Sequence, residues 1–319
     1  MEENPHSLQV SVVVPCYNSA KSLPELMERL DAVLAPRYDY EVVCVNDCSR
    51  DDTIVALRAL AARYDRLRVI DLVFNVGQFK ALFCAMEHSR GQVVVTIDDD
   101  LQHRPEDIPA LVDELLARPD LDVVIGAYRH KRHKAYRRLG TLLMRWIDRR
   151  VFGKPEGLRT SSFRAMRRVF VNALTAHHTQ FPVMGPLILS LTRRVANVEV
   201  EHQPRKYGRS GYRLSKLIST TFDNVINFSS LPLKCISIVG TFTAFVCMCI
   251  GLFFLVKYWI VGIPVPGWTS IMVMINFLCG MLLLSIGVIG EYLIRILKES
   301  KGSPRYCIRE TINLAGHED

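Results

Sequence analysis

Several features of secreted, zinc-binding or repetitive proteins are missing from this chain of 319 residues. The first ten residues contain no basic stretch followed by an apolar one, so we expect no signal peptide and an N-terminal half that stays in the cytoplasm. The nine cysteines show no C-x-x-C spacing, which favours reduced, packed thiols over a zinc site or a disulfide framework. We find no internal repeat and no low-complexity tract, which argues against a repeat architecture.

Positive charge is in excess but is not concentrated. The formal net charge of +8 suggests acidic partners, yet the basic residues are too dispersed to indicate nucleic acid. Anionic lipid head groups and phosphates explain the charge equally well, so we expect membrane lipids and no nucleic acid as partners.

Two long apolar runs, residues 235–256 and 271–289, contain no Asp, Glu, Lys or Arg. As helices, each would reach roughly the 30 Å of a bilayer core. They predict a transmembrane hairpin, with a pair of buried helices in a soluble protein as the alternative. Basic residues flank the pair, whereas the connecting loop, 257–268, holds only Lys257, so the positive-inside rule predicts both termini in the cytoplasm of a multi-pass protein of the bacterial inner membrane.

Before the apolar runs, strand-like and helical segments alternate. Predicted strands cover residues 10–14, 41–45, 68–73, 93–97 and 123–126, and predicted helices cover 23–34, 53–64, 78–89 and 105–117. This order predicts an α/β domain with a parallel, helix-covered sheet. Because ligands bind beyond the carboxyl ends of such strands, the polar segments 15–18, 46–49, 75–78 and 98–100 should converge on one edge of the sheet.

Two basic segments with helical apolar spacing, 136–151 and 214–228, are typical of helices lying in a head-group region, although ordinary core-facing helices share this pattern. The expected organisation is therefore a catalytic domain over 1–212, an amphipathic juxtamembrane helix over 213–232, two spans within 233–294 and a cytoplasmic tail over 295–319.

The cluster Asp98-Asp99-Asp100 ends an apolar strand with no neighbouring base to neutralise it. On an extended backbone Asp98 and Asp100 would point the same way and Asp99 elsewhere. Carboxylate and amide oxygens suit Mg²⁺ or Mn²⁺, which keep open positions for substrate phosphates. A solvated loop or helix cap is the alternative.

Together with V-V-P-C-Y-N at 13–18 and N-D-C-S at 46–49, the acidic cluster resembles the signatures of inverting family 2 glycosyltransferases. More narrowly, the chain resembles the polyprenyl-phosphate glycosyltransferases from residue 10 to about Arg305, including the G-E-Y at 290–292. The resemblance implies a GT-A-type, Rossmann-like catalytic domain that acts on a nucleotide-diphosphate sugar and a polyprenyl phosphate. It also implies a homo-oligomer, a tetramer in related proteins.

By resemblance, individual residues acquire expected roles. The nucleotide site would include Pro15, Tyr17, Asn18, Asp47, Gly77 and Asp98; the metal would be held by Asp98, Asp100 and Gln102; Arg129 and Arg164 would receive the acceptor phosphate; and Arg205, in a closing-loop signature with Gly208, Ser210 and Tyr212, would approach the donor phosphates. With Asp98 and Asp100, the three arginines form the expected catalytic set.

The chain departs from the family pattern where the nucleotide and sugar are recognised. Ser19, Cys48, Asn46, Phe74 and Gly211 replace a common Glu, Gly, Asp, Arg and Lys, and Cys16 stands within the V-P-x-Y-N block. These differences bear on the donor more than on the type of reaction.

The chemistry of the expected acceptor limits what the site must supply. The second pKa of a phosphate monoester lies near 6, so its oxygen is ionised at neutral pH and needs no strong general base. The site must instead bring two anionic phosphates together. Arginines suit this role, because their positive charge offsets the repulsion and they bind phosphate oxygens through several hydrogen bonds. Two spans are too few for a transport path, so flipping of the product would need a separate partner.

Two other functions compete with this one. A processive polysaccharide synthase would show Q-x-x-R-W, but Leu142 stands where that motif has Gln, and only two spans are expected. A nucleotide-binding scaffold or transporter subunit without activity is suggested by the departures at Ser19, Cys48 and Gly211.

Overall fold

The structure, a computed structural model, describes residues 8–128, 157–177, 183–201, 203, short stretches between 236 and 260, 267–300 and 304–314. The chain divides into two compact units, Met1–Gly211 with Pro304–Asp319, and Tyr212–Ser303. Much of the expected first span, 235–256, is described as short helical stretches. Both amphipathic segments, 136–151 and 214–228, lie outside the described residues.

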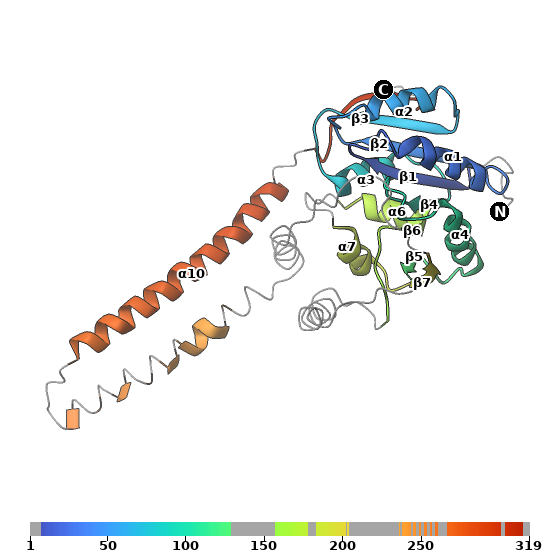
Figure 1. Cartoon of the computed structure of the whole chain (residues 1–319). Coiled ribbons are helices and arrows are strands. Elements are labelled where there is room, and N and C mark those ends of the chain that lie inside the picture. Colours follow the sequence, from blue (N-terminus) through green and yellow to red (C-terminus); the bar gives the residue numbers. More distant parts are fainter. Residues whose placement is uncertain are drawn as a thin grey trace. The chain divides into compact units, whose positions relative to one another are not determined.

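The first unit is built on an eight-stranded sheet (Figure 1). The strands are β1 (Val10–Cys16), β2 (Tyr40–Asn46), β3 (Leu67–Leu72), β4 (Val93–Thr96), β5 (Val123–Tyr128), β6 (Arg164–Arg167), β7 (Val195–Val200) and β8 (Ile308–Ile312), in the order β7-β5-β6-β4-β1-β2-β3-β8. The helices are α1 (Leu23–Leu34), α2 (Thr53–Ala61), α3 (Gln78–Glu87), α4 (Ile108–Ala117) after the short 3-10 helix η1 (Pro105–Asp107), α6 (Arg168–Thr175) and α7 (Met184–Leu191).

The predicted α/β fold is confirmed, but the sheet is mixed and not wholly parallel. β1 pairs in parallel with β2 and β4, and β2 with β3, as expected. β6 runs antiparallel to β4 and β5, and β8 runs antiparallel to β3. Both strands escaped the sequence analysis because R-A-M-R and I-R-E-T-I contain no continuous apolar run.

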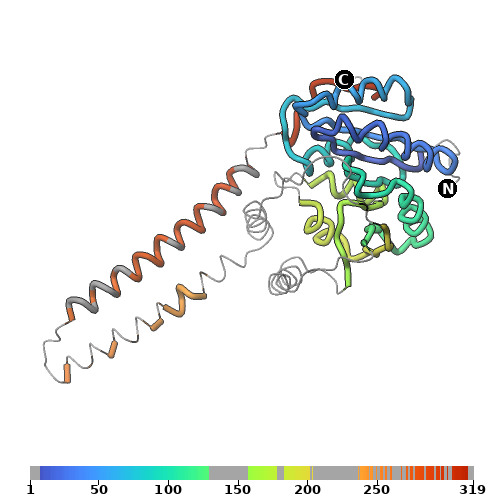
Figure 2. Tube along the Cα trace, viewed as in Figure 1, coloured from blue at the N-terminus to red at the C-terminus, as the bar shows by residue number. Residues whose placement is uncertain are grey.

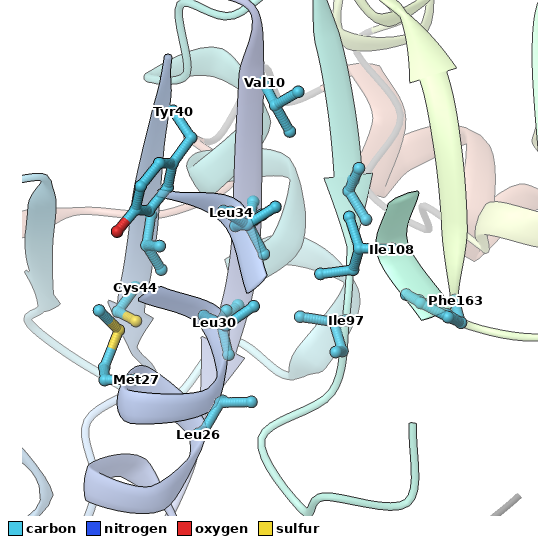
Figure 3. Packing of buried hydrophobic residues seen from close by; sticks show 14 of the residues in the cluster. Val10, Leu26, Met27, Leu30, Leu34, Tyr40, Cys44, Ile97, Ile108 and Phe163 are labelled. Atoms are coloured by element: carbon cyan, nitrogen blue, oxygen red, sulfur yellow. The ribbon is translucent and has the colours of Figure 1, made fainter. Parts of the chain in front are cut away.

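Alternating residues of the central strands face two separate hydrophobic layers. Val12 and Val14 of β1 lie in a core with α1, α2 and α4, whereas Val13 lies in a core with α3, α6 and α7. On α1 the buried side chains recur at helical spacing, at Leu23, Leu26, Met27, Leu30 and Leu34. Figure 3 shows several of them packed towards Cys44 and Ile97. Burial of each such side chain stabilises the fold by roughly 1.5–3 kcal/mol, so the sheet is a rigid base for its loops.

The second unit contains α10 (Trp268–Ser300), which covers the second predicted span. Its window Phe277–Ile294 has a mean hydropathy of 2.1, long and apolar enough to cross a bilayer. None of that window is buried, and Leu282 and Leu283 are 61% and 70% exposed.

The chain after α10 returns to the first unit, where we had expected only a tail. Ile308–Ile312 forms β8, which pairs with β3 at the edge of the sheet. This addition brings C-terminal residues close to the loops described next.

Candidate active site

The loops that follow β1, β2 and β4 are joined by hydrogen bonds at one edge of the sheet. The Tyr17 amide donates to Asp99 Oδ2 at 3.2 Å, which links the loops after β1 and β4. The Asn18 amide donates to Ser49 Oγ at 3.0 Å, which links the loops after β1 and β2. The predicted convergence of the post-strand segments is therefore confirmed for these three.

Asp47 joins the fourth loop, after β3, to the same group. Its carboxylate accepts hydrogen bonds from the amides of Val76 at 2.6 Å and Gly77 at 2.9 Å, and from Asn75 Nδ2 at 3.0 Å. Gly77 has φ +89°, a conformation that side chains rarely adopt, at the start of α3. Burial raises the pKa of Asp47, although the two backbone N–H groups act in the opposite direction. The observed contacts give Asp47 a role in fixing this loop, and its contact with a base or ribose stays a prediction.

The other expected nucleotide residues differ in exposure. Pro15 is buried inside β1, opposite Val45 of β2, where it packs as part of the sheet. Tyr17 is 44% exposed and Asn18 is also exposed, so both side chains are open to a ligand.

In the loops after β1, β2 and β4, one residue each, other than glycine, holds a left-handed backbone conformation. Asn18, Cys48 and Leu101 have φ angles of 55°, 52° and 60°, and they follow β1, β2 and β4. Such conformations are costly and persist where neighbouring contacts enforce them, often at functional sites. Here the enforcing contacts are the hydrogen bonds between the loops.

The acidic cluster lies beyond β4, which ends at Thr96, with Asp99 and Asp100 in a turn. The backbone at Asp99 and Asp100 is therefore a turn and not extended as we had expected. Asp99 does point away from Asp98, since its carboxylate accepts hydrogen bonds from the Tyr17 amide and the Ser19 hydroxyl. Burial raises the pKa of Asp99 to about 6. Asp100 Oδ1 accepts the amide of Gln102 at 3.1 Å, which closes a turn over this predicted pair of ligands.

Asp98 is surrounded by hydrogen-bond donors from three segments. Gln78 Nε2 lies 2.8 Å from Oδ1, Ser162 Oγ lies 2.5 Å from Oδ2, and His103 Nε2 lies 3.5 Å from Oδ2. Although burial opposes ionisation, His103 and Ser162 lower the pKa of Asp98 below its usual value. Asp98 is thus held as a carboxylate.

His103 and Ser162 are site residues that the sequence analysis missed. His103 is 3% exposed, its Nδ1 lies 2.9 Å from the Tyr128 hydroxyl, and its ring stacks on Tyr128 at 5.6 Å between centroids. His103 could have been found from its place three residues after Asp100. Ser162 lies 64 residues from Asp98 along the chain, and no local pattern marks it.

Arg164 opens β6 directly beside the acidic cluster, with Thr96 of β4 as its register partner. Arg164 is only 6% exposed, and its Nε has no hydrogen-bond partner among the described residues. Burial lowers the pKa of Arg164 to about 10, while the negative charge of Asp98 acts to raise it. A buried guanidinium with an unused donor favours contact with an anion, and the expected role of Arg164 towards the acceptor phosphate stays a prediction. The other two expected arginines, Arg129 and Arg205, lie outside the described residues, as do Gly208, Ser210 and Tyr212.

Comparison with known proteins agrees with this arrangement. Residues 11–177 match the Glycosyl transferase family 2 family. The chain belongs to glycosyltransferase family 2. An uncharacterized glycosyltransferase of Synechocystis is 32% identical over 95% of this chain and 96% of its own. An undecaprenyl-phosphate 4-deoxy-4-formamido-L-arabinose transferase of Pseudomonas fluorescens is 33% identical over 97% and 92%.

A solved structure shows the same fold. Glucosyl-3-phosphoglycerate synthase from Mycobacterium tuberculosis, in complex with Mn²⁺ and UDP-glucose, has a TM-score of 0.51 and 20% identity, covering 69% of this glycosyltransferase and 77% of its own chain. At that identity the likeness concerns the fold alone, and it supports the predicted GT-A-type domain.

A divalent cation fits the chemistry of this glycosyltransferase site. Among the described residues, no group of three or more His, Cys, Asp or Glu side chains is placed to hold a metal. Mg²⁺, however, is commonly bound through one or two carboxylates plus substrate phosphates. Asp98, held as a carboxylate, and Asp100, in the adjacent turn, supply that number.

Proposed function

We propose that this family 2 glycosyltransferase transfers a sugar, with inversion and with the help of a divalent metal, from a nucleotide-diphosphate sugar to a polyprenyl phosphate at the cytoplasmic face of the bacterial inner membrane. The observation that carries the proposal is the buried Arg164 guanidinium, with its unused Nε donor, beside the Asp98 carboxylate. The names of relatives that act on undecaprenyl phosphate support the choice of acceptor.

The donor would bind over the loops after β1 to β3. Tyr17 and Asn18 offer exposed side chains, and Asp47 holds the 75–77 loop that leads to Gly77 and α3. Because these loops are hydrogen-bonded before any ligand arrives, little ordering would be needed on binding. Asp98 and Asp100 would hold Mg²⁺ or Mn²⁺, with Gln102 nearby, and the metal would offset negative charge on the diphosphate.

In the reaction, the bond between the anomeric carbon and the donor diphosphate breaks as an oxygen of the lipid phosphate forms a new bond on the opposite face. That phosphate is already ionised at neutral pH, so none of the residues needs to act as a strong base. Arg164, and by resemblance Arg129, would bring the lipid phosphate into line, and Arg205 would approach the donor diphosphate. Their task is to reduce the repulsion between two anions.

A membrane location follows from the lipid acceptor and from α10. The candidate window of α10 is apolar and unburied, which suits a lipid surface better than the core of a soluble protein. We propose α10 as the second span of a hairpin, with both termini in the cytoplasm and basic amphipathic segments at the head groups. A tetramer, by resemblance, and a separate flippase for the product complete the proposal.

The test uses the full-length protein in detergent with undecaprenyl phosphate, Mn²⁺ or Mg²⁺ and a panel of labelled UDP- and GDP-sugars. We expect one lipid-linked product, lost on adding EDTA and restored by excess metal. Asp100→Asn should lower turnover at least about 100-fold while membrane insertion stays intact, because it removes a charge at the metal and no packing.

The matched control is Asp113→Asn, an exposed carboxylate on α4 that accepts a hydrogen bond from Tyr38, and this variant should keep full activity. Near-normal turnover by Asp100→Asn would overturn the metal assignment. No lipid-linked product from any donor would favour a scaffold, and a growing polysaccharide would indicate a processive synthase.

A further inference from the structure

The edge strand β8 is tied to β3 by more than its backbone pairing. The Val73 amide donates to the Cys307 carbonyl at 2.9 Å, Arg309 donates to the Val73 carbonyl at 3.1 Å, and Arg305 pairs with Glu87 of α3 at 2.8 Å. In Figure 2 the C-terminal strand, in red, lies beside the blue N-terminal part of the same unit. The chain after α10 is therefore an integral part of the catalytic unit.

One side chain of β8 reaches a buried carboxylate. Arg309 Nη1 lies 3.1 Å from Asp71 Oδ2, and Asp71, in β3, is only 3% exposed. Asn46 Nδ2, at the end of β2, donates to the other oxygen of Asp71 at 2.6 Å. A buried carboxylate that loses a cationic partner is costly, so the arrangement of Asn46 depends on Arg309.

The chain of hydrogen bonds continues from Asn46 into the donor loops. With its Nδ2 directed to Asp71, Asn46 turns its Oδ1 towards Ser49, which donates its hydroxyl at 2.6 Å. Ser49 Oγ in turn accepts the amide of Asn18, and Asn18 Oδ1 accepts the amide of Arg50 at 2.9 Å. Each group in the series uses the donor or acceptor that its neighbour leaves open, so the direction of the whole series is fixed.

This series accounts for a departure from the family pattern. A carboxylate at position 46 could not donate to Asp71 and would place two negative charges side by side. Asn46 therefore suits its place because it can donate to Asp71, and the negative charge of Asp71 is paired with Arg309 of β8.

We propose that Arg309 is a positioning residue for the donor site, which acts through Asp71, Asn46 and Ser49 on the strained Asn18 turn. The identity of the ligand rests on the proposed function, whereas the coupling rests on the hydrogen bonds alone. The C-terminal strand thereby completes the donor loops of the same chain after its passage through the second unit.

The test compares Arg309→Gln with Arg58→Gln in the full-length protein. Arg58 pairs with Glu310 on the same strand. Its charge also acts on Asp71, but its hydrogen bonds go to Glu310 and to no member of the series, so Arg58→Gln is the control for a lost positive charge without a lost contact. In hydrogen–deuterium exchange, Arg309→Gln should speed amide exchange over residues 16–22 and 46–52, and Arg58→Gln should not. Asn46→Asp should reproduce the effect of Arg309→Gln.

A second measurement separates positioning from a general loss of structure. Arg309→Gln should weaken binding of UDP or GDP with Mn²⁺ about five- to tenfold and raise the donor KM similarly, with kcat and the acceptor KM unchanged. Arg309→Lys should restore part of the loss, since an ammonium can still pair with Asp71.

The outcomes are distinct. Unchanged exchange over the two segments in Arg309→Gln overturns the inference, even when the enzyme is active. Faster exchange supports the coupling even when no donor is turned over, an outcome that would remove only the proposed function.

Discussion

The two sides of the sheet edge differ in whether their buried charged groups have hydrogen-bond partners. On the side of β1, β2 and β3, the carboxylates of Asp47 and Asp71 are buried, and each accepts hydrogen bonds from more than one group of the protein. On the side of β4 and β6, Arg164 is buried with an Nε that finds no partner among the described residues. The buried carboxylates of the first side have partners without a ligand, whereas the second side leaves a buried donor of Arg164 without an acceptor among the described residues.

From this difference we expect the two sides to have different roles in binding. Loops whose polar groups are already paired keep their shape and can present a fixed surface to a nucleotide. A buried guanidinium that has lost its water and lacks a full set of acceptors favours binding of an anion, because the anion supplies the missing acceptor. Substitutions at Arg164, Asp47 and Glu106 test this contrast, with the largest effect expected at Arg164 and the smallest at Glu106.

The largest effect concerns Arg164. Arg164→Met should lower transfer to the lipid phosphate about tenfold to 100-fold, because a charge-assisted contact is lost, and leave donor binding intact. The thermal midpoint should stay the same or rise, since the variant removes a buried charge that is only partly paired. The measurements are acceptor-dependent initial rates and thermal unfolding in detergent.

The control for Arg164 lies on the same strand. Arg167 donates to the carbonyls of Leu121 at 2.7 Å and Leu115 at 2.6 Å, so Arg167→Met should lower the thermal midpoint without a specific change in acceptor KM. If Arg164→Met instead lowered stability and left the acceptor dependence unchanged, Arg164 would belong with the structural charges and the contrast would fail.

For Asp47 we expect the opposite response to substitution, which is a loss of stability. In Asp47→Asn, one oxygen becomes an amide nitrogen facing N–H donors, which should lower the free energy of unfolding by about 1–3 kcal/mol. The measurement is denaturant or thermal unfolding of the full-length chain, with Asp113→Asn as an exposed control. A variant as stable as the wild type would mean that the 75–77 loop does not depend on the Asp47 carboxylate.

The sequence predicted most of this arrangement where long regular patterns exist. The helix over 23–34 has the expected bounds, because its apolar spacing is unbroken between Pro24 and the turn after Leu34. The loops that carry Asp47 and Asp99 lie at one edge of the sheet, as predicted, because each follows a buried strand. The short strands β6, β7 and β8 were missed, since their role depends on pairing with distant strands and not on apolar periodicity.

The same limit applies within the site. Ser162 reaches Asp98, and Arg309 reaches Asp71, only because β6 and β8 join the sheet. Their positions in the sequence carry no sign of these contacts. The roles of Arg129 and Arg205 came from resemblance and stay predictions.

The smallest effect concerns the Arg29–Glu106 pair, which joins α1, on the side of β1 and β2, to η1, which follows β4. Arg29 Nε lies 2.9 Å from Glu106 Oε1, and Arg29 Nη2 lies 2.7 Å from Glu106 Oε2. The hydrogen bond from Arg29 lowers the pKa of Glu106 below its ordinary value of 4.5. The ionised form therefore stabilises the fold above about pH 4.5, and this contribution is lost as the pH falls through the lowered pKa.

Glu106→Gln should accordingly reduce the free energy of unfolding by at most about 0.5 kcal/mol at pH 7, because both side chains are partly exposed and solvent screens the pair. The difference from the wild type should vanish at pH values below the lowered pKa and shrink in high salt. Glu114→Gln, which removes a looser pair with Arg118 at 3.6 Å, should change stability less. A difference that persisted in acid would show that Glu106 joins the two sides by packing, in which case they are coupled more firmly than their charges indicate.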